Sequence, residues 1–217
     1  MRYQTIFFDL DGTLSDPELG ICSSIQYALE KGGYPVEEDR SRYDSWIGPP
    51  LLRSFELHLN APPEECQRLL GFYRERFSTV GLFENEVYPG IPELLSELNH
   101  HGARLIVATG KPTVYSIQIL DHFGLLPCFE LISGISLDNE PLDKSGVIIE
   151  AMRRLNIRNR GDCVMIGDRD HDINGARMSG MDSIGVTYGY GTREELETAG
   201  AGFIVDSVRE LRELLLS

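Results

Sequence analysis

The segment TIFFDLDGT, residues 5–13, decides how the rest of the chain is organised. Its apolar residues 6–8 form a run that is too short for a helix and rich in β-favouring side chains, so a buried strand is predicted there. Two acids follow at the point where that strand should leave the core. Because residues two apart in an extended chain point to the same side, Asp9 and Asp11 should face one site together.

The turn after this strand suits a reaction centre. Gly12 lets the backbone turn tightly, and Thr13 adds a hydroxyl and a backbone N–H. In open α/β sheets, ligands bind outside the carboxyl ends of the strands. The segment therefore offers a carboxylate nucleophile beside a carboxylic acid–base, with room for a hard cation. Taken in isolation, the same residues are equally typical of a polar turn that caps an edge strand.

The composition is that of a globular protein with a sizeable core. The 217 residues are 41% hydrophobic and 25% charged, enough for one large domain or one domain with a modest insertion. Acids outnumber bases 34 to 20, and the net charge of −14 argues against a nucleic-acid or acidic-membrane partner. We find no apolar run of membrane-spanning length and no signal-peptide pattern, so we expect a cytoplasmic protein.

The cysteines point to the same compartment. The four of them are widely spaced and form no CxxC pair, which favours ordinary reduced thiols. They are Cys22, Cys66, Cys128 and Cys163.

Residues 17–83 carry helical patterns and no convincing strand. Asp16 is predicted to cap a helix that has Pro17 at its first position and ends at Gly32 and Gly33. Shorter helices are expected around residues 43–47, 51–59 and 63–77. We interpret this block as a helical subdomain inserted between two strand-bearing regions.

The chain from residue 91 onward alternates helices with strands. Strands are expected at residues 104–108, 130–133, 163–166, 183–186 and 203–205. Helices are expected at residues 91–101, 113–123, 144–155, 172–178 and 207–216. This alternation indicates a doubly wound parallel sheet. The predicted class is α/β, with a Rossmann-like core of residues 1–16 and 84–217 and an all-helical insert of residues 17–83.

Two later segments carry polar groups that suit an anion. The strand at 104–108 runs into Thr109 and Gly110, whose hydroxyl and N–H groups could cradle phosphate oxygens, although Thr-Gly is also an ordinary turn. Lys144 begins a helix, where a lysine is usually a solvated surface residue. The helix dipole disfavours a cation in the first turn, however, which leaves room for a role elsewhere.

A cluster of acids follows the strand at 163–166. Asp168, Asp170 and Asp172 lie within five residues of one another. Like charges so close together repel, and a bound cation would relieve that repulsion. A solvated acidic turn is the alternative interpretation.

Together the motifs resemble those of the haloacid dehalogenase superfamily. In chain order they are Asp9-x-Asp11-x-Thr13, Thr109, Lys144 and Gly167-Asp168-x-x-x-Asp172. The resemblance covers the whole chain, because each motif falls at a predicted strand or helix end. The helical insert is similar to the C1-type cap of that superfamily, and residues 47–51, IGPPL, are similar to those of phosphoglycolate phosphatase-like members.

The resemblance implies roles for the matching residues. Asp9 would be the nucleophile that takes the phosphoryl group as an aspartyl phosphate. Asp11 would be the acid–base that protonates the leaving oxygen and then activates water. Thr109 and Lys144 would hold phosphate oxygens, with Thr13 and Gly110 as further substrate-binding positions.

The resemblance also implies a cofactor, Mg²⁺. The ion would bind Asp9, the backbone carbonyl of Asp11, and Asp168, while Asp172 would orient this shell. The charges support such a division, since a phosphate dianion cannot approach Asp9 unless the metal and Lys144 offset the repulsion. True dehalogenases of this superfamily lack an aspartate at the place of Asp11, because a halide leaves without protonation. Asp11 therefore indicates phosphate ester chemistry.

The function expected from the sequence is that of a Mg²⁺-dependent phosphomonoesterase acting on a small soluble phosphate ester. Phosphoglycolate is the leading candidate; a nucleoside 5′-monophosphate, pyrophosphate or a sugar phosphate are alternatives, and a phosphomutase uses the same acids. A different class is a phosphate-responsive binding protein that has lost turnover. A receiver domain phosphorylated at Asp9 is disfavoured by the insert and by Asp11.

The cap is expected to supply specificity by closing over the site and touching the non-phosphate part of the substrate. Arg53 could meet a substrate carboxylate, or it could be a solvated helix residue. Trp46 is expected in the core of the cap, with stacking on a base as the alternative. The sequence does not distinguish a monomer from a homodimer.

Overall fold

The computed structural model describes residues 1–137 and 142–217, and the chain divides into two compact units. Residues Met1–Asp16 and Val87–Ser217 form the first unit, and Pro17–Glu86 forms the second. The second unit ends at Glu86, whereas the sequence placed the end of the insert at residue 83. Glu84 is held to the second unit by its ion pair with Arg76 at 2.7 Å and by the hydrogen bond that the Gly20 N–H donates to its carbonyl at 2.9 Å.

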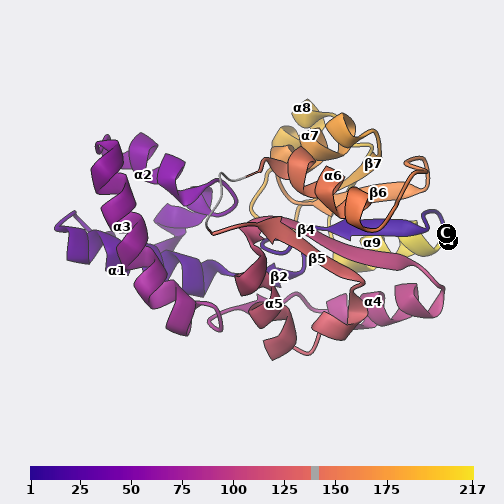
Figure 1. The fold of residues 1–217 in the computed structure, drawn as a ribbon, viewed down its shortest axis with the longest axis horizontal. Coiled ribbons are helices and arrows are strands. Elements are labelled where there is room, and N and C mark those ends of the chain that lie inside the picture. The colour runs from indigo at the N-terminus through magenta and orange to yellow at the C-terminus, as the bar shows by residue number, and fades with distance from the viewer. Residues whose placement is uncertain (138–141) are drawn as a thin grey trace. The chain divides into compact units, whose positions relative to one another are not determined.

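A parallel six-stranded sheet forms the centre of the first unit (Figure 1), as the alternation of strands and helices predicted. Its strand order is β5-β4-β1-β6-β7-β8. The bounds are β1 Thr5–Phe8, β4 Arg104–Pro112, β5 Leu131–Ile135, β6 Cys163–Gly167, β7 Asp182–Val186 and β8 Phe203–Val205. Because the chain moves outward from β1 to one side and then to the other, the topological switch point lies at β1.

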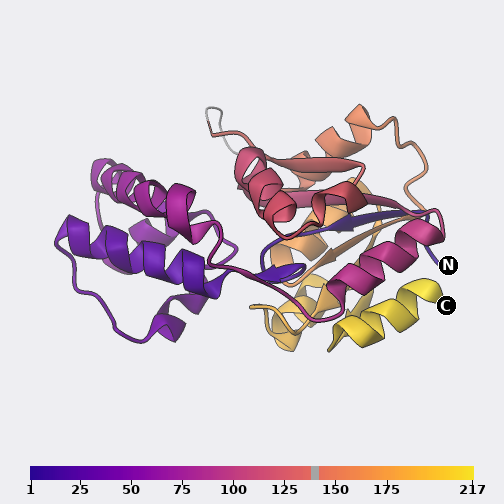
Figure 2. The same cartoon turned by 90° about the horizontal axis from the view of Figure 1, so that it is seen from below.

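Helices cover both faces of this sheet. In Figures 1 and 2, α6 and α7 lie on one face, while α4 and α5 lie on the other, where α9 packs beside α4. The bounds are α4 Ile91–His100, α5 Thr113–His122, α6 Lys144–Arg154, α7 Asp170–Ser179, α8 Arg193–Ala199 and α9 Val208–Leu216, with a short 3₁₀ helix at Leu126–Cys128. Helix α8 was not predicted, although Thr192 caps it by accepting from the Glu195 N–H, and Thr-x-x-Glu is a readable helix start.

The core of this unit is packed from side chains that alternate along the strands. All four residues of β1 are buried. Phe7 joins Ile106 and Met165 from the two neighbouring strands in a cluster that also contains Ile148 of α6 and Ala176 of α7. The neighbours of Phe7 in the chain point to the opposite face. Burial on both faces explains why β1 appears in the sequence as a continuous apolar run.

The regular elements of the second unit are helices, apart from its last residue, Glu86, which lies in β3 (Glu86–Val87). The unit contains α1 Glu18–Gly32, a 3₁₀ helix at Arg40–Trp46, α2 Leu51–Leu59, α3 Pro63–Arg76 and a π-helical turn at Phe77–Gly81. Trp46 is 5% exposed, stands edge-on to Tyr43 and Phe55, and stacks on the ring of His58. Trp46 is therefore a core residue of this unit, which agrees with the expected placement.

The predicted Asp16 cap of α1 is wrong. The residue at the cap position is Pro17, which has no side chain that could accept a hydrogen bond there. Asp16 instead belongs to β2 (Ser15–Asp16), which pairs with β3 (Glu86–Val87), and its carboxylate accepts a hydrogen bond from the Tyr190 hydroxyl. The C-terminal end is as expected, since Gly33 adopts the left-handed conformation with φ 80°.

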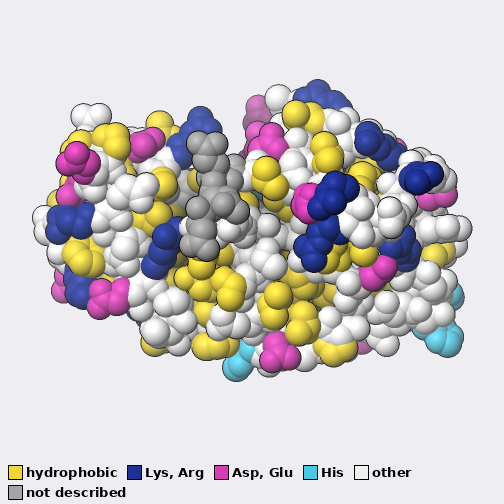
Figure 3. Space-filling model, in the orientation of Figure 1, with side chains coloured by type: hydrophobic (Ala, Val, Ile, Leu, Met, Phe, Trp, Pro, Cys, Tyr) yellow, Lys and Arg dark blue, Asp and Glu magenta, His cyan; other side chains and the backbone are white. Residues whose placement is uncertain are grey.

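The surface shows mixed charge. On the face drawn in Figure 3, acidic and basic side chains lie among apolar ones. Exposed ion pairs such as Arg104–Glu130 and Arg153–Glu150 join opposite charges. None of the four cysteines is in a disulfide; three are buried and Cys128 is half-buried. Across residues 1–137 and 142–217, every helix is too short or too polar to serve as a membrane span.

Candidate active site

Three neighbouring strands bring the predicted residues to one edge of the sheet. β1 lies between β4 and β6, with Phe8 in register with Val107 and Ile166. Asp9 follows β1 directly, Thr109 lies in β4, and Asp168 follows β6. Parallel strands present their carboxyl ends at the same edge, which is why residues so far apart in the chain meet here.

Lys144 joins two of the carboxylates. Its Nζ lies 2.9 Å from Asp9 Oδ1 and 2.8 Å from Asp172 Oδ1, and it donates to the carbonyl of Ala108 at 3.0 Å. The lysine side chain is 3% exposed, so it is not the solvated surface residue that its sequence position usually implies. Close packing against Gly175 keeps it there, because a Cβ at that glycine would collide with the lysine side chain.

These charges set the protonation states. Burial favours the neutral form of Asp9, but Lys144, His171 and the hydrogen bond from Thr109 outweigh burial and hold the pKa of Asp9 below its usual value. Burial likewise opposes the charged form of Lys144, yet Asp172 and Asp9 raise its pKa. Asp9 is therefore ionised at neutral pH, as a nucleophilic carboxylate must be.

Asp172 is also fully buried. The backbone N–H of Arg169 donates to its Oδ2 at 3.1 Å. Burial and repulsion from Asp9 raise the pKa of Asp172, against the opposing effect of Lys144. Gly167 makes room for this side chain, since a Cβ at Gly167 would collide with the Asp172 carboxyl group.

Asp11 forms an ion pair with a different lysine, Lys111, which was not predicted from the sequence as a site residue. Lys111 Nζ lies 2.9 Å from Asp11 Oδ2, and the two side chains are 5% and 14% exposed. Burial raises the pKa of Asp11 despite this lysine, so the carboxyl group holds a proton more readily than an exposed aspartate. The sequence did contain a signal, because Lys111 is two residues beyond Thr109 and alternation in a strand places both on one side.

The structure differs from the sequence expectation at Thr109. We expected a strand-to-helix turn there, but β4 continues to Pro112, so Thr109 lies inside a strand. The Thr109 hydroxyl accepts a hydrogen bond from the Lys111 N–H at 3.2 Å. Gly110, the other predicted phosphate-binding position, is exposed. The strand lengthens because β4 pairs with β5 as far as Pro112, a contact that no local sequence pattern reports.

Asp168 sits in a cradle of glycines. A Cβ at Gly12, Gly189 or Gly191 would collide with Asp168. Its Oδ2 accepts the N–H of Tyr190 at 2.8 Å, and its Oδ1 is buried with no partner among the described residues. Burial, followed by repulsion from Asp172 and Asp9, raises the pKa of Asp168 to about 7.

These features fit a divalent cation at Asp168. An unpartnered buried carboxylate oxygen beside two further carboxylates is a costly arrangement that a hard cation would relieve. Asp9 and Asp168 are the carboxylates that would hold the ion, together with the backbone carbonyl of Asp11. The Thr13 hydroxyl is a second buried polar atom without a described partner, while its N–H donates to the Leu10 carbonyl at 3.3 Å.

A second possible cation group overlaps the site. Ligand atoms of Asp9, His171 and Asp172 all lie within 4.8 Å of one another. The ammonium of Lys144 already bridges the two carboxylates of that group, so the positive charge there is supplied by the protein. His171 was not predicted from the sequence. Burial lowers its pKa, but Asp172 and Asp170 outweigh burial and raise it.

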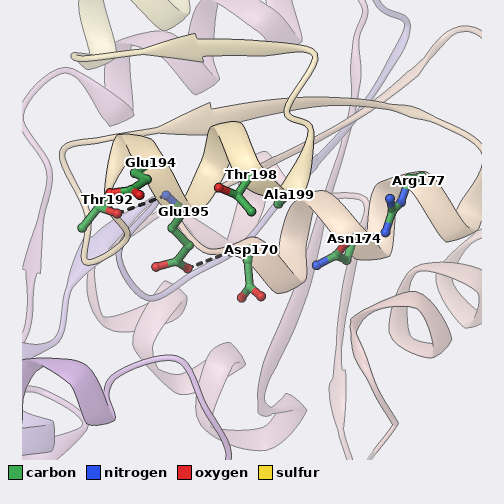
Figure 4. A pocket seen from close by; sticks show the side chains of 8 residues that line it. All are labelled: Asp170, Asn174, Arg177, Thr192, Glu194, Glu195, Thr198 and Ala199. Carbon is green, nitrogen blue, oxygen red and sulfur yellow. Dashed lines mark hydrogen bonds between the residues drawn. The ribbon is translucent and has the colours of Figure 1, made fainter.

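A pocket of about 440 Å³ lies elsewhere in this unit, between α7 and α8 (Figure 4). Its lining residues are Asp170, Asn174, Arg177, Thr192, Glu194, Glu195, Thr198 and Ala199. Asp170, from the acidic cluster that follows β6, lines it, whereas the residues to which the motifs assign a role do not. The predicted cap residue Arg53 is exposed on α2 of the second unit.

The doubly wound parallel sheet, with buried carboxylates at the carboxyl ends of its strands, defines the class of the protein as an α/β enzyme with a Rossmann-like core. Residues 6–186 match the haloacid dehalogenase-like hydrolase family. The chain belongs to this family, and it is a phosphatase.

Relatives named for an activity align with nearly the whole chain. It is 40% identical to a 5′-nucleotidase of Pseudomonas aeruginosa over 100% of this chain and 97% of the relative. It is 36% identical to the tyrosine-protein kinase PtkA of Mycobacterium tuberculosis, covering 98% and 72% respectively. It is also 32% identical to a phosphoglycolate phosphatase of Caulobacter vibrioides, covering 94% and 86%.

Solved structures show the same fold. A predicted phosphatase from Clostridium acetobutylicum is 47% identical and superposes with a TM-score of 0.94, over 100% of this chain and 99% of the other. The fold predicted from the sequence is therefore found in an experimentally solved relative.

Proposed function

We propose that this phosphatase is a Mg²⁺-dependent phosphomonoesterase that hydrolyses a small soluble phosphate ester through an aspartyl phosphate on Asp9. The observation that carries the proposal is the buried Lys144 ammonium shared by Asp9 and Asp172, next to the unpartnered carboxylate oxygen of Asp168. A buried cation and a carboxylate that requires a cation, together with an ionised nucleophile, suit a phosphate dianion.

Each residue has a stated task in this mechanism. Asp9 attacks phosphorus, and Asp11 gives a proton to the leaving oxygen and then takes one from the attacking water. Lys144 neutralises charge on the phosphoryl group while keeping Asp9 ionised, and Thr109 holds a phosphate oxygen. Asp172 holds the Lys144 ammonium through the ion pair at 2.8 Å. Bound Mg²⁺ would offset the remaining charge of the phosphoryl group.

The comparisons bear on the substrate. Phosphoglycolate led the candidates from the sequence, and a relative named phosphoglycolate phosphatase supports it at 32% identity. A nucleoside 5′-monophosphate is supported more strongly, because the relative named 5′-nucleotidase is 40% identical over its nearly complete length. We therefore place both at the head of the panel, followed by pyrophosphate and sugar phosphates.

Transfer to an acceptor other than water is the second candidate function. A relative at 36% identity carries the name tyrosine-protein kinase. An aspartyl phosphate is a high-energy intermediate that an acceptor hydroxyl could intercept in place of water. A phosphomutase and a phosphate-responsive binding protein without turnover complete the set of rivals, and the helical unit is proposed to act as the cap that selects among substrates.

The experiment is a phosphate-release assay on purified protein. p-Nitrophenyl phosphate, phosphoglycolate, a 5′-monophosphate, pyrophosphate and a sugar phosphate are ranked by kcat/KM, with Mg²⁺ and with EDTA. We expect Mg²⁺-dependent release, and we expect Asp9→Asn to abolish it because an amide cannot attack phosphorus. Activity of Asp9→Asn within about tenfold of wild type would contradict the nucleophile assignment.

A second arm tests the rivals. The protein is incubated with [γ-³²P]ATP and a tyrosine-containing peptide, and peptide label is compared with free phosphate. Label on the peptide in place of free phosphate would favour transfer, and isomerised sugar phosphate without release would favour a mutase. Binding of phosphate esters with no turnover of any substrate would support the binding protein.

A further inference from the structure

Lys111 is a buried lysine to which neither the sequence motifs nor the proposed reaction gives a task. The chain has only three lysines, and two of them, Lys111 and Lys144, are buried beside the carboxylates of the site. The third, Lys31, forms an exposed pair with Glu75. Burying an ammonium is costly unless a specific partner offsets the lost hydration. For Lys111 such a partner is Asp11, whose Oδ2 lies 2.9 Å from the lysine Nζ.

The backbone of β4 is irregular where it carries this lysine. β4 and β5 pair at Ala108 with Ser133 and again at Pro112 with Ile135, so four steps along β4 match two along β5. The extra length contains Thr109 and Lys111. Gly134 of β5 accommodates it, because a Cβ there would collide with the Lys111 carbonyl. Close backbone packing thus holds Lys111 in place.

The two carboxyl oxygens of Asp11 differ in whether they have a partner. Oδ2 is held by Lys111, whereas Oδ1 is buried without a partner in the described parts of the chain. We propose that Lys111 is a positioning residue that fixes the Asp11 carboxyl group through Oδ2 and so presents Oδ1 to the leaving-group oxygen. This inference rests on the proposed phosphatase reaction and adds to it the residue that orients the general acid.

The step balances as follows. The bond between Asp9 and phosphorus forms while the bond between phosphorus and the ester oxygen breaks, and the proton on Asp11 Oδ1 passes to that oxygen, releasing an alcohol. Asp11 becomes a carboxylate, and the Lys111 ammonium compensates the new charge. In the second half, Asp11 takes a proton from water as water attacks phosphorus, which frees Asp9 and phosphate.

The test compares the single-turnover bursts of wild type and five variants with esters of two different leaving groups. The proteins are wild type, Lys111→Met, Asp11→Asn and the double variant, and the control is Lys31→Met, which removes a lysine outside the site. The esters are p-nitrophenyl phosphate, whose leaving group needs no proton, and the better of phosphoglycolate and a 5′-monophosphate. Lys111→Arg serves as the conservative rescue, and inorganic phosphate binding checks that the site is intact.

We expect Lys111→Met to slow the alkyl ester burst by roughly tenfold or more and the p-nitrophenol burst distinctly less. In the Asp11→Asn background, adding Lys111→Met should slow the alkyl ester burst little further, because the two residues act as a unit. Lys111→Arg should recover part of the loss, and Lys31→Met should match wild type. Equal loss from both esters, or an undiminished loss in the Asp11→Asn background, would overturn the inference while leaving the phosphatase intact. A wild-type protein inactive on every ester would overturn the proposed function and this inference together.

Discussion

The Nζ atom of Lys144 lies 2.9 Å from Asp9 Oδ1, and the same ammonium lies 2.8 Å from Asp172 Oδ1. One buried positive charge therefore serves two buried carboxylates. Removal of the lysine would leave the like charges of Asp9 and Asp172 with only His171 to compensate them, whereas removal of Asp172 would leave Lys144 and Asp9 as a pair. Lys144 thus stabilises the buried carboxylates in addition to the catalytic role that we propose for it, and the two roles can be separated by experiment.

Lys144→Met should lower the free energy of unfolding by about 3–5 kcal/mol, because it breaks a buried ion-pair network from its centre. Urea denaturation at neutral pH measures the loss. Adding Asp172→Asn to that variant should restore part of the stability, since one uncompensated charge is gone, but no phosphatase activity. A double variant no more stable than Lys144→Met would mean that packing of the lysine stem, and not charge, stabilises the site.

Asp168 should make the metal-free protein less stable as pH rises. Its pKa is about 7 when folded, above the value of about 4 expected when unfolded. The folded state then binds the proton more tightly, so the free energy of unfolding falls between about pH 4 and 7. Urea denaturation in EDTA at pH 5 and pH 8 should show this fall in wild type relative to Asp168→Asn.

Mg²⁺ supplies the complementary measurement. At pH 8 the ion should raise the unfolding midpoint of wild type, since it binds only the folded state, and should do so much less for Asp168→Asn. Below about pH 7 the proton competes, and the apparent affinity should weaken by about tenfold per pH unit. Parallel stability profiles in the two proteins, with equal Mg²⁺ effects, would show that Asp168 is not the titrating metal ligand.

The fold could be predicted largely because its strands are buried on both faces. Continuous apolar runs such as 6–8 and 163–166 have no other stable place in a chain of this length, and the expected strand at Phe203–Val205 matches β8. The ends of the helices and strands were harder to predict from the sequence. β4 reaches Pro112 only because β5 pairs with it there, and Asp16 is drawn into β2, where Tyr190, far away in the chain, donates to it.

The site residues were predictable where a reactive side chain lies directly at the end of a predicted strand or helix. Asp9, Lys144 and Asp172 meet as the sequence motifs imply, because parallel strands end at one edge. Lys111 was missed because a lysine three residues past the expected end of a strand is normally solvated. The alternation that puts Lys111 on the same side as Thr109 applies only because β4 continues to Pro112, where it pairs with β5.

The helical unit offers a paired test of specificity. Arg53→Ala removes an exposed side chain, so it should leave stability nearly unchanged while altering the ranking of substrates relative to p-nitrophenyl phosphate. Trp46→Ala leaves a cavity in the core of the unit and should lower the free energy of unfolding by about 3–5 kcal/mol. Thermal unfolding and kcat/KM on the substrate panel measure both. If Arg53→Ala lowers kcat/KM for all substrates by the same factor, Arg53 does not select among them.

Asp11→Asn tests the general acid through leaving-group chemistry. An alkoxide needs a proton as its bond to phosphorus breaks, whereas p-nitrophenolate departs readily without one, and general acid help is typically worth about a hundred- to ten-thousand-fold. The variant keeps the backbone carbonyl that we assign to Mg²⁺, so metal binding should survive. Formation of the aspartyl phosphate should slow far more from an alkyl phosphate than from p-nitrophenyl phosphate, while its hydrolysis should slow for both, because water then lacks its base. Single-turnover quench-flow follows the two bursts. Equal loss of both would mean that Asp11, with Lys111 at its Oδ2, holds the site together and gives no proton to the leaving group.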